Sequence, residues 1–224
     1  WARGDTQIVG WLKTKVKNKD KQLVKNPMNL LEKYKILDNI IRMFLNPMLL
    51  IVLLLSFTCK GNKTFIWIGL VILEIALSVI LFIKSKMSIK EKNIKRVYYN
   101  KILYGGKSIL LRSYISFATI PYYTKLYMDA FFRTIYRLLF THKNLLNWTT
   151  AEDVEKSSKN TTILAYLRDF IFNYIIGLLF ILIGIITSNY AAYIISFIFI
   201  TAPFILYKVS KNIDDEKTDL KEKQ

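Results

Sequence analysis

The chain alternates between long runs of apolar residues and shorter stretches rich in lysine and arginine. Four runs are long enough, at about 1.5 Å of helix rise per residue, to cross most or all of a hydrocarbon core about 30 Å thick. They are Met43–Cys59, Phe65–Ile83, Phe170–Ile186 and Tyr190–Tyr207. The connections within the first pair and within the second pair are short. The pattern therefore predicts an all-α, polytopic membrane protein with two helical hairpins and at least four spans.

Lysine and arginine are distributed unevenly along this pattern. Residues 1–42 contain ten and residues 84–107 contain eight, whereas the hairpin connections at 60–64 and 187–189 contain two and none. Because loops rich in these residues stay on the cytoplasmic side, both termini and the middle segment are expected to be cytoplasmic. The chain is therefore expected in the cell inner (plasma) membrane. The predicted segments are 1–42, 43–83, 84–169, 170–207 and a charged tail at 208–224.

The middle segment contains a charged stripe that argues against a further span. Its members recur at every fourth position of residues 122–141 and are Lys125, Asp129, Arg133 and Arg137. Four charged groups in hydrocarbon would cost too much, so this segment is expected to form an amphipathic helix at the membrane interface. The stripe fits contacts to lipid phosphate or to a polymer, or a solvated face with an Asp129–Arg133 ion pair. One or two additional spans within 109–141 are an alternative.

Two local patterns mark expected starts of helices. Asn29 precedes Glu32 by three residues, which is the spacing of a capping box, and predicts an amphipathic helix that leads into the first span. Thr149 and Glu152 have the same spacing and predict a second, short helix. The lead-in helix completes the predicted cytoplasmic segment of residues 1–42.

The composition narrows the classes of function. The 224 residues include 33 Lys and Arg against 16 Asp and Glu, a net charge of +17. This charge is spread over membrane flanks, so anionic lipid explains it and no nucleic-acid partner is expected. Cys59 and His142 are the only cysteine and histidine. That excludes a disulfide framework and disfavours a zinc site or a histidine-dependent nucleophile, and His142 is expected on a loop.

One charged residue, Glu74, lies near the middle of the second apolar run. A carboxylate at that depth is costly unless it is protonated or paired. In either of those forms Glu74 could fix the packing of the first hairpin. The other interpretation is that it contributes a polar contact to a conduit through the membrane.

Ordered blocks within residues 1–155 carry a resemblance to a known family. The opening Trp1-Ala2-Arg3-Gly4-Asp5-Thr6-Gln7, with Trp11-Leu12, is similar to a W-x-R-G-D-W-Q…W-L pattern. The later blocks are Asn26-Pro27-Met28, residues 34–42, Pro121-Tyr122, Met128-Asp129-Ala130, residues 133–137 and residues 145–151. Together they resemble the cyclic β-1,2-glucan synthases. Thr6 stands where that family has Trp, and Asn147 stands where it has Glu.

The resemblance implies a membrane-embedded processive glycosyltransferase that uses UDP-glucose and extends a glucan. In that family the transferase precedes the membrane region and a phosphorylase-like glycoside domain follows it. Residues 1–42 would then be the end of the transferase module, and the chain would be a fragment without the catalytic core. The aspartates that bind the nucleotide sugar, and the Mg²⁺ or Mn²⁺ of the full-length enzyme, are expected upstream. The fragment alone is expected to bind no cofactor and to be inactive.

The resemblance also assigns candidate substrate-binding residues. Trp1 matches the last residue of a Q/R-x-x-R-W motif and is expected to stack on the acceptor sugar, because an indole can bury the apolar C–H face of a pyranose. Arg3 and Asp5 are expected to orient that loop, with an ion pair between them as one way of doing so. No catalytic or metal-binding residue is expected within the chain itself.

Two other functions fit the predicted spans without the resemblance. A non-enzymatic membrane scaffold or assembly subunit requires only the helices and is the main alternative. A small transporter is disfavoured, because the sequence has no internal repeat and few polar groups within the spans besides Glu74.

Overall fold

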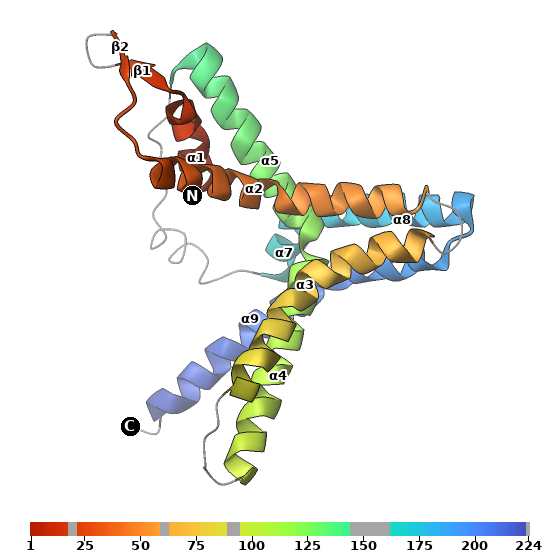
Figure 1. Cartoon of the computed structure of the whole chain (residues 1–224). Coiled ribbons are helices and arrows are strands. Elements are labelled where there is room, and N and C mark those ends of the chain that lie inside the picture. The colour runs from red at the N-terminus through yellow and green to blue at the C-terminus, as the bar shows by residue number, and fades with distance from the viewer. Residues whose placement is uncertain (18–21, 59–62, 89–94, 144–161, 223–224) are drawn as a thin grey trace. The chain divides into compact units, whose positions relative to one another are not determined.

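The computed structural model describes residues 1–17, 22–58, 63–88, 95–143 and 162–222, and it is predominantly helical (Figure 1). Its N-terminal elements are α1 (Ala2–Ile8), the 3₁₀-helix η1 (Val9–Leu12), β1 (Lys15–Lys17) and β2 (Leu23–Lys25). Next come α2 (Leu30–Ser56), α3 (Lys63–Ser88), α4 (Lys95–Ala118) and α5 (Ile120–Tyr136), which continues into the π-helical turn η2 (Arg137–Thr141). The last elements are α7 (Ile163–Asp169), α8 (Ile171–Thr187) and α9 (Tyr190–Glu222).

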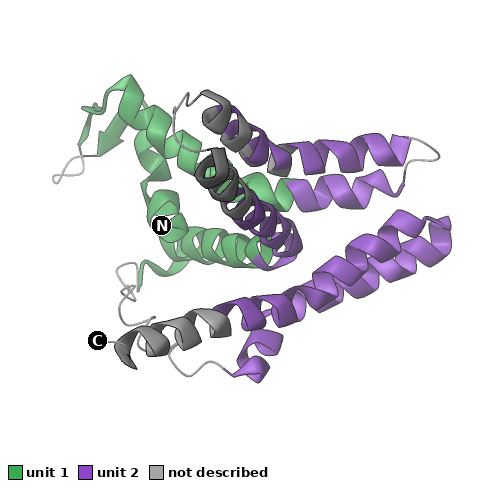
Figure 2. Ribbon diagram, turned by 90° about the horizontal axis from the view of Figure 1, so that it is seen from below, with its two compact units in different colours: residues 1–48, 123–160 green, residues 49–122, 161–224 purple. Residues whose placement is uncertain are grey.

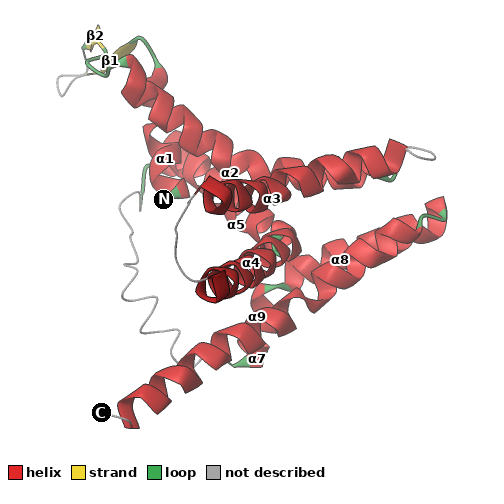
Figure 3. Ribbon diagram, turned by 60° about the horizontal axis from the view of Figure 1, so that its bottom comes forward, coloured by secondary structure: helices red, strands yellow, loops and turns green. Residues whose placement is uncertain are grey.

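The chain forms two compact units, which Figure 2 shows in different colours. Unit 1 comprises residues 1–48 and 123–160, and unit 2 comprises residues 49–122 and 161–224. Each unit therefore joins two stretches that are far apart in the sequence. Among the described residues, strand structure is limited to β1 and β2 in unit 1 (Figure 3).

The predicted capping box at the start of α2 is confirmed. The backbone N–H of Glu32 donates to Oδ1 of Asn29, and the backbone N–H of Asn29 donates to Oε2 of Glu32, both at 2.8 Å. These bonds satisfy backbone donors that a helix start would otherwise leave without a partner. From there α2 runs unbroken through Pro47 to Ser56, so the predicted boundary between residues 42 and 43 lies inside one helix. The Thr149–Glu152 pattern lies outside the described residues.

The side chain of Asn26 organises the N-terminal elements of unit 1. Strands β1 and β2 pair antiparallel, with Val16 opposite Val24. The Asn26 amide donates to the carbonyl oxygen of Lys13 at 2.8 Å and also to that of Trp11. Its Oδ1 accepts a hydrogen bond from the backbone N–H of Met28 at 2.9 Å. One side chain thus ties η1 and the strand pair to the segment that enters α2.

The second predicted hairpin is present in unit 2 as α8 and α9, which lie side by side (Figure 3). Their backbones approach closely at Gly177, where Oγ of Ser196 donates to the Gly177 carbonyl oxygen at 2.7 Å. A Cβ at position 177 would lie 2.7 Å from Cγ1 of Ile200. The turn places Ser188 in the left-handed region at a φ of 53°. Only a residue without a side chain fits the closest approach of the two helices.

The core of unit 2 is formed by apolar side chains from several helices. Phe180 on α8 packs against Phe57 at 5.3 Å and against Phe199 at 5.7 Å between ring centroids. All three rings are almost completely buried. The remaining buried members of this cluster are Leu50, Leu53, Val71, Ile120, Ile176, Ala192 and Ile195.

One amide, that of Asn173, lies within this apolar surrounding and is completely buried. Its Nδ2 donates to the carbonyl oxygens of Ala118 at 2.8 Å and Phe199 at 3.2 Å. Phe199 lacks its usual helical donor because the residue four positions later, Pro203, has no N–H. Ala118 is the last residue of α4, a position at which helical carbonyls lose their intrahelical donors. Asn173 therefore joins α4, α8 and α9 through backbone groups that need a donor.

Two helical segments are long and apolar enough to cross a membrane, Leu30–Ser56 and Tyr190–Ser210. Helices α7 and α8 pass the same test only as a pair, and they are bent by 59° at the break between them. The described residues therefore support membrane association through two spans, or three if the bent pair is one span, which is fewer than the predicted four. Within α3, Lys63–Leu73 is a shorter apolar helix. The side chain of Glu74 lies outside the described residues.

Gly177→Ala should destabilise the α8–α9 hairpin. The new methyl group would meet Cγ1 of Ile200, whose β-branched side chain has little freedom in a helix, and overpacking of this kind costs about 1–3 kcal/mol. Gly69→Ala is the matched control, because nothing lies within 4 Å of a Cβ at that position of α3. There, helix propensity should stabilise the chain by up to about 1 kcal/mol. Unfolding in detergent, followed by circular dichroism, measures both variants, and equal stabilities would contradict the close packing.

Asn173→Leu should destabilise unit 2 by about 1–3 kcal/mol, because it removes the donor to two buried carbonyl groups. The same substitution in a Pro203→Ala background tests the cause. Alanine at position 203 restores an N–H for the Phe199 carbonyl, so the cost of Asn173→Leu should be smaller there. Free energies of unfolding for the four chains of this double-mutant cycle decide the point. An unchanged cost in the alanine background would show that the Phe199 bond contributes nothing.

Candidate functional site

The residues predicted to bind substrate lie at the start of unit 1. Trp1 precedes α1, and Arg3 and Asp5 are on it. Helix α1 is anchored by Thr6, which is completely buried and donates from Oγ1 to the Ala2 carbonyl oxygen at 2.7 Å. Thr6 Oγ1 also lies 3.8 Å from Sδ of Met43 on α2. Thr6 therefore occupies a buried packing position. A residue the size of threonine lets α1 lie against α2.

Trp1 precedes α1 and is largely exposed, at 61% of its surface. Its ring centroid lies 5.4 Å from that of Tyr127 on α5, with the planes tilted by 57°. Tyr127 in turn stacks on Tyr123, one helical turn earlier, at 5.7 Å and 23°. The three rings form a continuous group, which we call the aromatic row. It combines an exposed indole with two phenols that support it.

The phenol of Tyr127 is held in its neutral form. Partial burial raises the pKa of Tyr127 above its ordinary value, and the neighbouring Tyr123 raises it further. Both causes disfavour the phenolate, so the hydroxyl group keeps its proton up to a higher pH than a free tyrosine would. In this neutral form a tyrosine hydroxyl group can both donate and accept a hydrogen bond.

Asp5 is oriented by α2 rather than by Arg3. Its Oδ1 accepts a hydrogen bond from Nδ2 of Asn39 at 3.2 Å. No ion pair between Arg3 and Asp5 occurs in the described part of the chain, so that way of orienting the loop is not seen in the structure. The reason is helical geometry, because residues two positions apart on α1 point to different faces. The contact with Asn39 connects the first sequence block to the block at residues 34–42.

The charged stripe lies on α5 and η2. The predicted Asp129–Arg133 ion pair is confirmed, at 2.6 Å between Oδ1 and an Arg133 Nη atom. Both side chains are more than half exposed, and an exposed pair at this spacing contributes only about 0.2–0.5 kcal/mol. Lys125 is also exposed, and Arg137 is half-buried at the start of the π-helical turn. This geometry is compatible with a solvated face and with a surface that contacts phosphate.

His142 ends the π-helical turn. It adopts a left-handed conformation with a φ of 50°, and its N–H donates to the Arg137 carbonyl oxygen at 2.8 Å. Its side chain is exposed, as expected for a residue on a loop. Within the described ranges, no group of three or more histidine, cysteine, aspartate or glutamate side chains is placed to hold a metal ion.

The sequence interpretation missed the two tyrosines of the aromatic row. Tyr123 and Tyr127 are four residues apart and lie beside the Pro121-Tyr122 and Met128-Asp129-Ala130 blocks. The spacing could have indicated that they share a helical face. That this face would meet Trp1 depends on how α1 packs in unit 1, which no local pattern encodes.

Comparison with known proteins was made against family models and against curated proteins. No family model matches the chain, and no curated protein matches it.

Proposed function

We propose that the chain is the membrane region of a UDP-glucose-dependent β-1,2-glucan synthase, which anchors the transferase and positions its acceptor-side loop. One observation carries the proposal. Trp1 opens the first block that resembles this family, Tyr127 directly precedes the Met128-Asp129-Ala130 block, and their rings are in contact. A residue of the first block and the residue next to a later block thus form one surface.

The chemistry of that surface suits a sugar. An indole face buries the apolar C–H side of a pyranose while the sugar hydroxyls keep their hydrogen bonds. Trp1 is exposed enough to receive such a ring, and Tyr127 supports the indole from one side. Asp5, held by Asn39, keeps the start of α1 in a fixed relation to α2. The aromatic row would therefore hold the growing glucan, with Trp1 as the sugar-contacting residue and Asp5 and Arg3 as residues that shape the loop.

In this proposal the chemical step takes place in a transferase domain upstream of Trp1. That domain would bind UDP-glucose together with Mg²⁺ or Mn²⁺, which neutralises the diphosphate leaving group. A phosphorylase-like glycoside domain would follow the chain. The residues present here contribute acceptor binding and attachment to the bilayer, so the chain by itself would be inactive.

The membrane arrangement that accompanies this function has two hairpins with four spans and both termini on the cytoplasmic side of the inner membrane. Two segments of span length and the α8–α9 hairpin support it. The lysine and arginine density of residues 1–42 and 84–107 supports the orientation. The exposed stripe on α5, including the Asp129–Arg133 pair, supports an interfacial position for that helix.

In the full-length enzyme, Trp1→Ala should abolish most glucan synthesis while leaving UDP-glucose affinity nearly unchanged. Loss of the indole misplaces the acceptor, and a displacement of about 1 Å can lower the rate on the order of 10²-fold. Trp1→Phe should keep part of the activity, because a smaller ring still covers the sugar. Trp11→Ala is the matched control, since Trp11 is also partly exposed but lies on η1 outside the aromatic row.

Glucan yield and UDP-glucose affinity are measured side by side on the purified variants. If Trp1 served only packing, Trp1→Ala would lower thermal stability and weaken donor and acceptor use together, and that result would refute the stacking role.

The reading frame upstream of Trp1 tests the function itself. A continuous frame that encodes a nucleotide-sugar domain with a D-x-D motif supports the synthase, whereas a start codon immediately upstream supports a non-enzymatic scaffold.

Cysteine-accessibility mapping on a Cys59→Ser background tests the membrane arrangement. Cysteines introduced at Asn62 and Ser188 should react with an impermeant thiol reagent in intact cells, because the hairpin turns face outward. Cysteines at Lys90 and Lys211 should react only after the membrane is permeabilised. External labelling at either lysine position would refute the proposed topology.

A further inference from the structure

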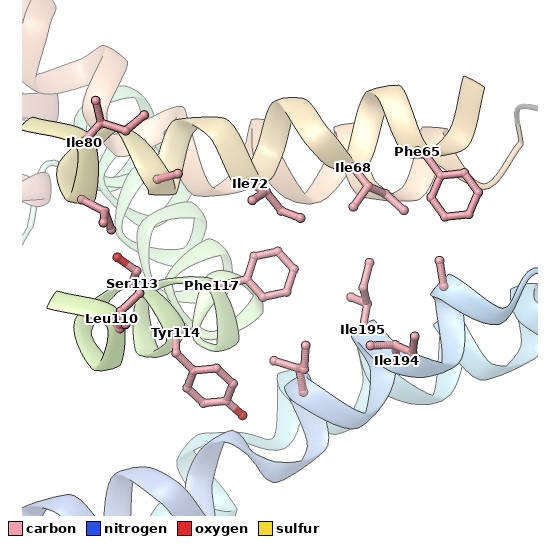
Figure 4. Close-up of a pocket in the computed structure, with 14 residues that line it drawn as sticks. Phe65, Ile68, Ile72, Ile80, Leu110, Ser113, Tyr114, Phe117, Ile194 and Ile195 are labelled. Atoms are coloured by element: carbon pink, nitrogen blue, oxygen red, sulfur yellow. The ribbon is translucent and has the colours of Figure 1, made fainter. Parts of the chain in front are cut away.

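Unit 2 contains an open apolar cleft of about 540 Å³ between α3, α4 and α9 (Figure 4). This volume lies within the range of about 300–1,000 Å³ that is usual for ligand sites. Among its lining residues, only Ser113 and Tyr114 have polar side-chain atoms, and the others are alanine, valine, leucine, isoleucine or phenylalanine. An occupant of the cleft must therefore be largely hydrocarbon.

The helices that line the cleft carry two lysines beyond one of its ends. Ile80 on α3 and Leu110 on α4 line this end, whereas Phe65 lines the opposite end, as Figure 4 shows. Lys84 follows Ile80 by four residues and Lys107 precedes Leu110 by three. These spacings keep a side chain on the same helical face, one turn farther along. Both lysines are exposed, and their spacing places them on the continuation of the lining faces beyond the Ile80–Leu110 end.

A polar group lies between these lysines and the apolar interior of the cleft. The hydroxyl oxygen of Ser113 is buried and has no hydrogen-bond partner among the described residues. Ser113 lies three residues after Leu110 on α4, and it lines the cleft. A buried hydroxyl group without a partner is unusual in proteins, so a ligand that offers it an acceptor would be favoured.

We propose that this cleft binds one acyl chain of an anionic phospholipid, with the lipid phosphate on Lys84 and Lys107. The acyl chain fills the apolar lining. The Ser113 hydroxyl oxygen is buried in the structure and would donate to the ester carbonyl that joins chain and head group after rotation of its side chain toward the cleft. The order of lysines, hydroxyl group and hydrocarbon along the cleft matches the order of phosphate, ester and acyl chain in the lipid. A helix of a second copy of this chain would fill the apolar part but leave both lysines without an anion. The proposal does not depend on the glucan synthase function.

The experiment uses the purified full chain in detergent with two photoreactive lipids that carry the same diazirine-labelled acyl chain. One is phosphatidylglycerol, which is anionic, and the other is phosphatidylcholine, which is zwitterionic. After irradiation, peptide mass spectrometry locates the labelled residues. Phosphatidylglycerol should label the peptides that contain Ile72 and Phe117, unlabelled phosphatidylglycerol should compete, and phosphatidylcholine should label the same peptides much more weakly.

Substitutions test the two lysines and the apolar part of the cleft separately. Lys84→Gln or Lys107→Gln should each lower cleft labelling by phosphatidylglycerol about five-fold, and the double variant about 25-fold. The matched control is Lys63→Gln with Lys25→Gln, which removes two exposed lysines that do not extend the lining faces. Ala76→Phe with Ala191→Phe should abolish cleft labelling with both lysines intact, because the new rings would occupy the cleft.

Equal cleft labelling by the two lipids on the unchanged chain would overturn the proposal, and this comparison does not depend on whether any variant folds. A loss of labelling in the Lys63 and Lys25 control equal to that in the Lys84 and Lys107 variant would also overturn it, because charge alone would then explain the effect. Crosslinks between cleft peptides and a second copy of the chain, in place of lipid, would assign the cleft to self-association instead.

Discussion

The arrangement of unit 2 depends on the requirement that buried backbone carbonyl groups find donors. Pro203 removes the donor that the Phe199 carbonyl would have in an uninterrupted helix, and α4 ends at Ala118. The amide of Asn173 donates to both carbonyl groups from one nitrogen. Since apolar contacts are non-directional, they would allow these helices to slide or rotate, whereas the two hydrogen bonds define one register. The rings of Phe57, Phe180 and Phe199 then pack within that register.

Local features could be predicted from the sequence because they depend on spacing alone. The capping box of Asn29 and Glu32, the ion pair of Asp129 and Arg133 and the α8–α9 hairpin are examples. The role of Asn173 could not be predicted, since its acceptors lie 55 and 26 residues away and only packing brings them together. The bend of 59° between α7 and α8 could not be predicted either, because hydropathy does not reveal that the helix breaks near Phe170.

At the candidate site, too, contacts between residues that are far apart in the sequence could not be predicted. The sequence directed attention to charged residues, because charges at regular spacing are conspicuous in an apolar chain. The structure instead joins Trp1 to Tyr127 and Asp5 to Asn39, each pair drawn from separate parts of unit 1. Arg3 and Asp5 do not form an ion pair with each other, because the opening residues form a helix, on which side chains two positions apart diverge. Had those residues formed an extended loop, a different set of partners would have been within reach.

The position of Asn173 between its two acceptors has a consequence for the biosynthesis of the chain. Synthesis proceeds from the N-terminus, so Ala118 has already been made when Asn173 leaves the ribosome, whereas Phe199 follows 26 residues later. Until α9 is complete, the amide has only one of its two acceptors, and a polar group without its partners is costly to move into hydrocarbon. Burial of α8 therefore becomes more favourable only after α9 has been synthesised. If both helices enter the bilayer, they are for this reason expected to do so together rather than one after the other.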